Sequence, residues 1–294
     1  MSISLLGATE IRKLADELAL TPSKGLGQNF VHDSNICEKI ARLADIRSDD
    51  LVIEVGPGLG SLSLSIAKSG AKLVAIEIDK RLASRLPKTL VDHGVDRDSF
   101  TVIARDAMEV DRNELAAALS SQRSVKLVAN LPYNVSVPVL IHFLEMEVFV
   151  TALVMVQSEV AERLAAKPGS KEYGVPSAKV AWYADATLSD SVPRAVFWPV
   201  PRIDSSLLKL EVHPPLGDRE LRKLTFSIID AAFNQRRKML RSSLAALTKE
   251  LLPAKSSEEI LVSSGIDPTA RAESLSIVDF RSIARTIETL RKSL

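Results

Sequence analysis

LVIEVGPGLG, residues 51–60, is a short apolar run that stops at three closely spaced glycines. A run rich in Val, Ile and Leu is typical of a strand buried on both faces of a parallel sheet. The glycines after it permit a turn with positive φ and let a ligand approach the backbone closely. Such a turn alone is a weak signal, because a tight turn without a ligand has the same sequence.

Strand and helix patterns alternate outward from this stretch. The expected strands are Leu51–Glu54, Lys72–Ile78, Phe100–Ala104, Val125–Ala129 and Ala152–Val156. Helical patterns occur at residues 10–20, Lys80–Leu90, Arg112–Leu119 and Val137–Leu144. This alternation predicts a doubly wound, Rossmann-like α/β sheet.

The alternation ends after the fifth strand. Two further strands, Trp182–Leu188 and Ser205–Val212, are joined by the proline-rich stretch VPRAVFWPVPRID, which predicts an antiparallel addition to the sheet edge. From Pro214 onward the pattern is helical only, and the last helix is expected to begin at a capping box of Ser276 and Asp279. We therefore expect one domain at 1–212 and a small all-α domain at 213–294.

The composition limits the classes of protein to which this chain can belong. The 294 residues, 46% of them hydrophobic, suffice for a real core. No apolar run approaches the roughly 20 residues of a membrane span, and the N-terminus lacks the pattern of a signal peptide. Cys37 is the only cysteine and the four histidines are scattered, so we expect neither a disulfide nor a metal site. These features favour a cytoplasmic protein.

The spacing of the glycines narrows the class of ligand. A dinucleotide-binding turn reads G-x-G-x-x-G and aims a helix N-terminus at a pyrophosphate. Gly56, Gly58 and Gly60 are instead spaced G-x-G-x-G, and the acidic Glu54 precedes them. A carboxylate there suits a cationic or amino-bearing ligand better than a diphosphate, and S-adenosylmethionine is such a ligand. The spacing disfavours a nicotinamide-dependent dehydrogenase.

Polar residues at other strand ends fit the same ligand. Glu77 ends the second strand, where a carboxylate can accept hydrogen bonds from ribose hydroxyls. Asp106 follows the third strand and can accept from an adenine amino group, although a turn aspartate is the alternative. Asn130 ends the fourth strand. Since ligands gather at the carboxyl ends of strands in such a sheet, we expect these residues and Gly56 to share one site.

The tetrapeptide Asn130-Leu131-Pro132-Tyr133 ends its strand abruptly. A plain strand-to-helix turn is one explanation. If the turn faces a methyl donor, the Asn130 side-chain oxygen and the Leu131 carbonyl can each accept one N6–H of adenine. That amine is a poor nucleophile because its lone pair is delocalised, so both hydrogen bonds would strengthen in the transition state. Pro132 would then stiffen the turn and Tyr133 would stack on the base.

These motifs resemble those of the ribosomal RNA adenine N6,N6-dimethyltransferases, and in particular their small-subunit (16S) branch of the kasugamycin-sensitivity type. The resemblance runs nearly end to end, in GQNF at 27–30, EVGPGLG at 54–60, EID at 77–79, DA at 106–107, NLPYN at 130–134, VQSEVAERL at 156–164, FWPVPRIDSS at 197–206, AFNQRRKMLRSSL at 232–244 and GIDPTARAESLS at 265–276. Two departures are Val31, where leucine is usual, and Arg202, where lysine is usual.

The resemblance implies a site and a substrate. Tyr133 and Phe197 would sandwich the target adenine. The family dimethylates two adjacent adenosines in a hairpin loop near the 3′ end of small-subunit rRNA and monitors ribosome assembly, so we expect an immature 30S-type particle as partner and a monomeric enzyme. The residues then expected around S-adenosylmethionine are Asn29, Val31, Gly56, Gly58, Glu77, Asp106 and Asn130.

Two alternatives share this fold. A macrolide-resistance methyltransferase modifies one adenosine in large-subunit rRNA by the same chemistry, but the long helical tail favours the small-subunit enzyme. A non-catalytic RNA-binding relative is disfavoured by the intact NLPY motif and the complete glycine turn.

The basic run Gln235–Arg241, QRRKMLR, is the candidate RNA contact. Residues 214–294 hold 14 Lys and Arg against 10 Asp and Glu, whereas the rest of the chain holds 24 against 27 and is slightly acidic. Read as one helix, the run places Arg237 and Arg241 on one face, although such a face is often merely solvated. Since the acidic part cannot hold a polyanion alone, the cations expected to contact rRNA backbone are Arg236, Arg237, Lys238 and Arg241.

Overall fold

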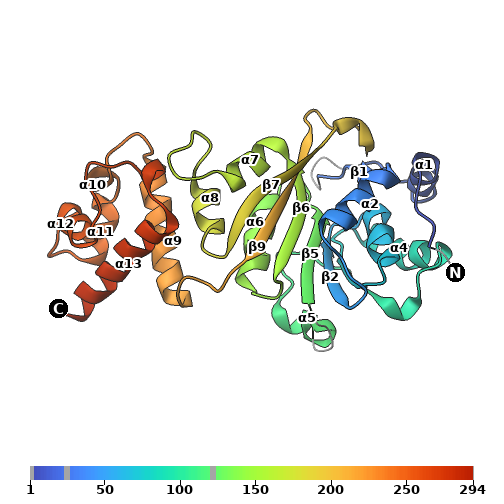
Figure 1. Ribbon diagram of the computed structural model, residues 1–294, viewed down its shortest axis with the longest axis horizontal. Helices are drawn as coiled ribbons and strands as arrows, with labels where there is room; N and C mark the ends of the chain where they lie inside the picture. The colour runs from blue at the N-terminus through green and yellow to red at the C-terminus, as the bar shows by residue number, and fades with distance from the viewer. Residues whose placement is uncertain (1–2, 23–26, 120–123, 294) are drawn as a thin grey trace. The chain divides into compact units, whose positions relative to one another are not determined.

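A computed structural model describes residues 3–22, 27–119 and 124–293 (Figure 1). Its main feature is a seven-stranded sheet with the strand order β4-β3-β2-β5-β6-β9-β7. The five predicted parallel strands are present as β2 (Asp50–Val55), β3 (Lys72–Ile76), β4 (Phe100–Ile103), β5 (Ser124–Asn130) and β6 (Thr151–Gln157). β2 pairs in parallel with both β3 and β5, so the chain winds outward in both directions from β2. The doubly wound sheet is therefore confirmed.

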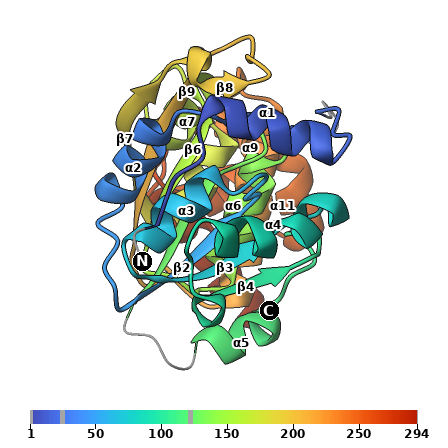
Figure 2. The ribbon, with the colours of Figure 1, turned by 90° about the vertical axis from the view of Figure 1, so that its right-hand side faces the viewer.

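Helices lie along both faces of this sheet (Figures 1 and 2). They are α1 (Ala8–Glu17), α2 (Ser34–Leu43), α3 (Ser61–Lys68), α4 (Lys80–Asp92), α5 (Arg112–Leu119) and α6 (Ser136–Glu145). Short 3-10 turns occur at Arg97–Ser99, Arg194–Val196 and Ala272–Ser274. Val52, Leu64 and Leu73 belong to one apolar core cluster between sheet and helices, which is what a strand run buried on both faces predicts. Within the described residues, no helix has both the length and the apolar character to cross a bilayer.

The antiparallel edge is also confirmed. β9 (Ser205–Val212) pairs antiparallel with β6, and β7 (Ala184–Val192) forms the outer strand. The predicted start of β7 was two residues too early. Trp182 and Tyr183 instead close the turn after α8 (Val175–Val180), and both rings pack edge-on against Phe226.

A second, two-stranded sheet was not predicted from the sequence. β1 (Phe30–Val31) pairs antiparallel with β8 (Phe197–Trp198), and the pairing joins Val31 to Phe197. Two-residue strands carry no readable alternation, so only the fold reveals the contact. It brings the GQNF segment to the proline-rich stretch.

The chain forms two compact units. Unit 1 comprises residues 1–161 and 187–212, and unit 2 comprises residues 162–186 and 213–294. The chain passes from unit 1 to unit 2 between residues 212 and 213, where the sequence predicted the domain boundary. The segment 162–186, predicted to belong with the sheet, groups instead with the helices, because Tyr173, Trp182 and Tyr183 pack on rings of α9 (Arg219–Asn234).

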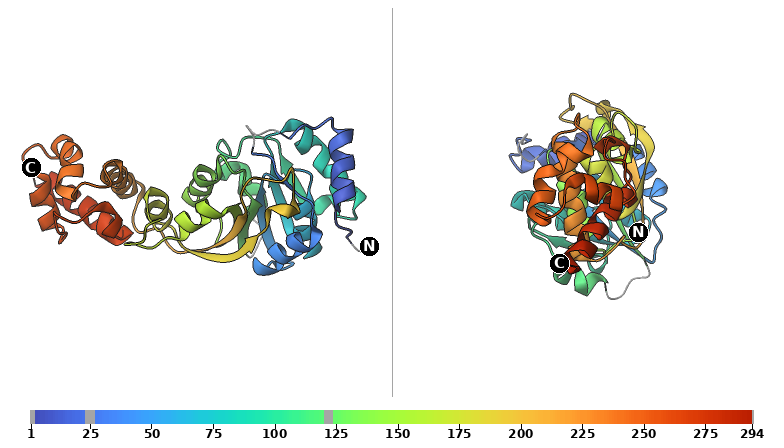
Figure 3. Two further views of the ribbon diagram at one scale, coloured as in Figure 1. Left: turned by 90° about the horizontal axis from the view of Figure 1, so that it is seen from above. Right: turned by 90° about the vertical axis from the view of Figure 1, so that its left-hand side faces the viewer.

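Unit 2 is helical, and its C-terminal helices form one bundle (orange to red in Figure 3). The last helix begins at the predicted capping box, in which Ser276 and Asp279 bond reciprocally. Phe233 and Phe280 contact each other with ring centroids 6.1 Å apart, which joins α9 to α13. The helices are α7 (Ser158–Ala165), which starts in unit 1, α8, α9 (Arg219–Asn234), α10 (Leu240–Ser243), α11 (Ala245–Leu251), α12 (Ser257–Ser263) and α13 (Ile277–Lys292).

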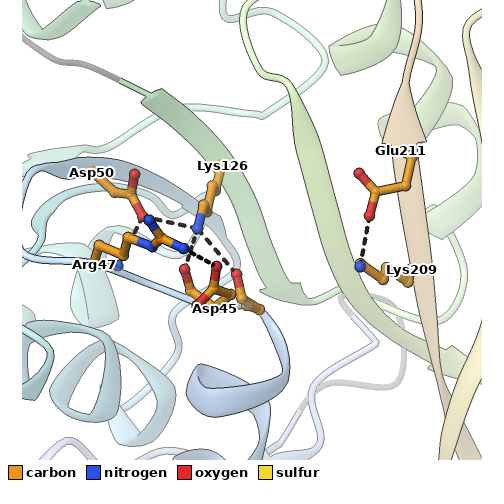
Figure 4. Close-up of polar contacts among 7 residues, drawn as sticks. Asp45, Arg47, Asp50, Lys126, Lys209 and Glu211 are labelled. Carbon is orange, nitrogen blue, oxygen red and sulfur yellow. Dashed lines mark hydrogen bonds and ion pairs between the residues drawn. The ribbon is translucent and has the colours of Figure 1, made fainter.

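A buried ion pair stabilises the amino-terminal edge of the sheet (Figure 4). Lys126 of β5 lies 2.9 Å from Asp50 of β2, and its ammonium also donates to the carbonyls of Ala44 and Asp45. These bonds satisfy a charge that burial would otherwise make costly. The pair thus fixes the loop into β2 at the edge opposite the site described next.

Candidate functional site

A cavity of about 240 Å³ opens at the carboxyl ends of β2, β3 and β5. This is where the strand order reverses, the usual place for a ligand in a doubly wound sheet. The cavity walls come from the glycine turn, from residues after β3 and β4, from the NLPY turn and from the GQNF segment. All residues predicted to bind the cofactor line it, namely Asn29, Val31, Gly56, Gly58, Glu77, Asp106 and Asn130.

The glycine turn brings backbone to the cavity surface. Gly56 and Gly58 have φ of +71° and +58°, a region that side chains disfavour. A Cβ at Gly58 would lie 2.9 Å from the Phe30 ring. Glycine is therefore required here both by conformation and by the close approach of the GQNF segment.

Glu77 is held by backbone donors. Its two carboxylate oxygens accept from the N–H of Gly58 at 3.1 Å and from the N–H of Asp79 at 2.9 Å. Burial raises the pKa of Glu77, and these two hydrogen bonds offset part of that rise. The carboxylate is thus positioned before any ligand arrives.

Glu54 is a second buried carboxyl on the cavity wall. It is 1% exposed, accepts a 2.6 Å hydrogen bond from the Ser63 hydroxyl, and lines the same cavity. Burial, reinforced by the charge of Glu77, raises the pKa of Glu54 to about 8. Two buried carboxyls beside one cavity favour a cationic ligand, because a positive charge there offsets the cost of ionising them. In the sequence, Glu54 indicated the class of ligand but was not included among the predicted binding residues. An acidic residue inside an apolar strand could have indicated that it lines the site.

Asp106 fits both of its sequence interpretations. Its carboxylate accepts from the N–H of Met108 at 2.9 Å, which is the turn role, and it also lines the cavity. One carboxylate oxygen can serve each role.

Asn130 presents an unsatisfied acceptor. Its side-chain nitrogen donates to the Asn29 carbonyl at 3.1 Å, which fixes the orientation of the amide. The side-chain oxygen is then buried and has no hydrogen-bond partner within the described part of the chain. A buried acceptor without a partner costs about 1–3 kcal/mol, so a donor from a ligand would be favoured at this position.

The rest of the NLPY turn is rigid. The Leu131 side chain is buried, and its N–H donates to the Met155 carbonyl at 3.1 Å. The Pro132 ring comes within 3.5 Å of the Cβ position of Gly56, so the proline contacts the glycine turn directly. The two turns form one wall of the cavity.

Tyr133 and Phe197 lie beside the cavity rather than in its lining. Their rings meet edge to face, with centroids 6.4 Å apart and planes at 72°. A base stacked between two rings needs them parallel and roughly 7 Å apart, twice the contact distance. This structure does not show that arrangement, and Phe197 is fully buried, so the sandwich would require one ring to turn. The Tyr133 hydroxyl bonds to Ser205 at 2.6 Å, a contact that no sequence pattern indicated.

The basic segment Gln235–Arg241 does not form one helix, and that prediction was wrong. α9 ends before the segment, residues 235–237 form a turn, and α10 begins at Leu240. The backbone N–H groups of Leu240 and Arg241 donate to the carbonyls of Ala270 and Pro268, not to carbonyls four residues earlier. The shared helical face expected for two of the arginines does not exist.

All four cations of the segment are exposed, but they differ in their partners. Arg236 bonds to Glu273 at 3.0 Å, and Arg241 lies 3.7 Å from Glu258. Within the described ranges, the cations of this segment without an acid in ion-pair range are Arg237 and Lys238. The same ranges contain no group of three or more His, Cys, Asp or Glu side chains placed to hold a metal ion.

Comparison with known proteins identifies the relatives of this chain. Residues 21–288 match the family model of the ribosomal RNA adenine dimethylases. The ribosomal RNA small subunit methyltransferase A of Corynebacterium jeikeium is 47% identical and aligns over 97% of this chain and 96% of its own length. The enzyme of the same name from Cutibacterium acnes is 48% identical, over 98% and 95%.

Solved structures share the fold. A dimethyladenosine transferase from Plasmodium falciparum superposes with a TM-score of 0.72 at 23% identity, over 90% of this chain and 98% of that one. The 23S rRNA methyltransferase ErmE gives 0.61 at 22% identity, over 88% and 99%.

Proposed function

This chain belongs to the ribosomal RNA adenine dimethylase family, and on that premise we propose that it uses S-adenosylmethionine to dimethylate N6 of two adjacent adenosines in small-subunit rRNA. Two relatives that are nearly half identical to this chain over almost their whole length are both named small subunit methyltransferases. Their names support small-subunit rRNA over large-subunit rRNA as the substrate. We place the target in a hairpin loop near the 3′ end of the rRNA, within an immature 30S-type particle, with a role in small-subunit biogenesis in the cytoplasm. We further propose that the enzyme acts as a monomer.

The cavity suits S-adenosylmethionine. Glu77 would accept from the ribose hydroxyls, Asp106 from the adenine amino group, and the glycine turn would lie against the ligand where no side chain fits. The buried carboxyls Glu54 and Glu77 suit its cationic groups. When bound, this cofactor supplies an electrophilic methyl group.

The buried, unpartnered oxygen of Asn130 carries the proposal. Adenine N6 becomes nucleophilic as it pyramidalises and its lone pair leaves the ring. The Asn130 oxygen would accept one N6–H and the Leu131 carbonyl the other, and both bonds would strengthen as positive charge develops on nitrogen. The hydrogen bond to Asn29 presents this oxygen, rather than the amide nitrogen, to the base. No strong general base is needed until the nitrogen is cationic.

The target adenine must leave its stack to reach the cavity, as base-modifying enzymes require. Tyr133 follows Pro132, which lines the cavity, and its ring would stack on the extruded base beside that wall. Phe197 would support this ring from its edge and would complete the sandwich only after a turn of one ring.

Labelled S-adenosylmethionine tests the proposal. The protein should transfer label to isolated small ribosomal subunits that lack these methyl groups, and the label should map to two adjacent adenosines as N6,N6-dimethyladenosine. Transfer to large subunits alone would indicate the macrolide-resistance activity. No transfer to either subunit, together with retained RNA binding, would indicate a non-catalytic relative.

A further inference from the structure

The prolyl loop, residues 198–204, lies against the base-stacking ring at both of its ends. Phe197, just before the loop, contacts the Tyr133 ring edge to face, and Ser205, just after it, bonds to the Tyr133 hydroxyl at 2.6 Å. A loop of this length that starts and ends at one side chain reaches no farther than about 14 Å from it. The tip of the loop therefore lies within about 14 Å of the ring on which the target adenine would stack.

The base of the loop is fixed. The Arg194 N–H donates to the Asp204 carboxylate at 2.8 Å, and the Arg194 guanidinium donates to the Arg202 carbonyl at 3.0 Å. Both the N–H and the hydroxyl of Ser158 donate to the Asp204 carbonyl at 3.1 Å. Pro199 and Pro201 restrict the backbone further. The conformation of the loop base is thus restrained by hydrogen bonds and by two prolines.

The tip carries apolar side chains into solvent. Val200 is 61% exposed and Ile203 is 44% exposed, and the exposed cation Arg202 lies between them in the sequence. Single exposed apolar residues are common and need no explanation. Val200 and Ile203 differ from such single residues because they lie on one restrained loop, both ends of which contact Tyr133. No contact within the described part of unit 1 buries either side chain.

We propose that the tip of the prolyl loop is a wedge, with Val200 and Ile203 entering the rRNA at the gap that the extruded adenine leaves and Arg202 contacting a flanking phosphate. The inference rests on the proposed function. Unstacking a base is unfavourable, and apolar side chains inserted between bases offset this cost in proteins that deform nucleic acids. The wedge would thus favour the extruded state, whereas Tyr133 would hold the base once extruded.

The double variant V200S/I203S tests the wedge. The probe is an RNA hairpin with two adjacent loop adenosines, one replaced by 2-aminopurine, whose fluorescence rises on unstacking. Wild-type protein should raise the fluorescence, and V200S/I203S at saturating concentration should give less than about half of that rise. Methyl transfer to small subunits should fall about tenfold, with unchanged affinity for S-adenosylmethionine.

Val262→Ser is the matched control, because Val262 of α12 is 62% exposed and lies in unit 2. It should behave as wild type in both assays. V200A/I203A removes the side-chain bulk without adding hydroxyls and should repeat the defect, which keeps the test valid if the serine variant folds poorly.

The outcomes separate the wedge from the proposed function. If wild-type protein methylates small subunits and the double variants match it in fluorescence and in rate, the wedge is refuted while the function stands. If wild-type protein neither methylates small subunits nor unstacks the probe, the proposed function fails, and the wedge fails with it. A defect equal in V200S/I203S and in Val262→Ser would also refute the wedge, since the effect would not belong to the loop.

Discussion

The carboxyl edge of the sheet and the segment Gln235–Arg241, called the basic turn, both hold polar residues that the sequence suggested as binding groups, yet they are built in opposite ways. At the sheet edge, Glu54 and Glu77 are almost fully buried and bonded to named donors. In the basic turn the cations are exposed, and Arg236 bonds to a neighbouring acid.

The difference lies in what each site costs the folded protein. A buried polar group is expensive unless something satisfies it, so its presence in a cavity wall points to a ligand or a partner. An exposed cation costs almost nothing, so its presence alone says little. Substitutions at the sheet edge should therefore have large, specific effects, and those in the basic turn should have small, salt-dependent ones.

Asn130→Ala should produce the largest effect. Removal of the buried side-chain oxygen of Asn130, which has no partner among the described residues, should slow methyl transfer about 100-fold or more, with donor affinity only modestly weakened. Single-turnover rates and calorimetry measure the two quantities separately. Asn113→Ala, at an exposed asparagine of α5, is the control. Near-normal turnover of the Asn130 variant would contradict its assigned role.

Glu77→Ala should mainly weaken binding of the donor. A carboxylate that accepts hydrogen bonds from hydroxyl groups contributes about 1.5–3 kcal/mol to the binding free energy. The dissociation constant for S-adenosylmethionine should therefore rise about 10- to 100-fold. Calorimetry with the Glu250→Ala variant, which changes an exposed acid of α11, controls for overall charge. Unchanged affinity would exclude the ribose role of Glu77.

Tyr133→Ala should slow methylation by the removal of one stacking ring, worth about 1–3 kcal/mol, and Tyr133→Phe should cost less. Ser205→Ala should match Tyr133→Phe, because both remove the same 2.6 Å hydrogen bond. The double variant Tyr133→Phe, Ser205→Ala should then be no worse than either single variant. Additive reductions in rate would show that Ser205 acts elsewhere.

Glu54→Gln should change how stability depends on pH. The pKa of Glu54 is raised from 4.5 to about 8 in the folded protein. Between these values the unfolded chain ionises at this position while the folded protein stays protonated, so the free energy of unfolding falls as pH rises. The glutamine keeps an acceptor for Ser63 but cannot ionise. The melting temperature of the variant relative to wild type should therefore increase between pH 5 and pH 8, and a pH-independent difference would argue against a buried, titrating Glu54.

The basic turn should give the smallest effect. With Arg236, Arg237, Lys238 and Arg241 all changed to Gln, subunit binding should weaken and donor affinity should not change. For each phosphate that is no longer neutralised, the slope of log affinity against log salt should become shallower by roughly 0.7–0.9.

Paired and unpaired cations can be compared within that turn. Arg237 and Lys238, which need break no ion pair to reach RNA, should account for more of the slope than Arg236 and Arg241. Lys249→Gln, at an exposed lysine of α11, is the control. An unchanged slope in the quadruple variant would show that the turn is merely solvated.

The sequence by itself determined the sheet and most of the cavity wall at its carboxyl edge. The strand ends at Gly56, Glu77, Asp106 and Asn130 could be placed together because parallel strands bring their carboxyl ends to one edge, a rule that needs no side-chain detail. The capping box at Ser276 could also be predicted, since it depends on residues close in sequence. The strand β9 was predicted from its own apolar run and from the proline-rich stretch before it, although its partner β6 lies far away in the chain.

Only the tertiary structure decided the remaining features. The bond from Asn130 to Asn29, the pairing of Val31 with Phe197 and the contact of Ser205 with Tyr133 each join segments far apart in the chain. The basic run shows the same limit: its local pattern favoured a helix, but the carbonyls of Pro268 and Ala270 captured the N–H groups that a helix would have used. Local pattern predicts an element while its hydrogen bonds stay local, and distant acceptors override it when they offer the same bonds in the packed protein.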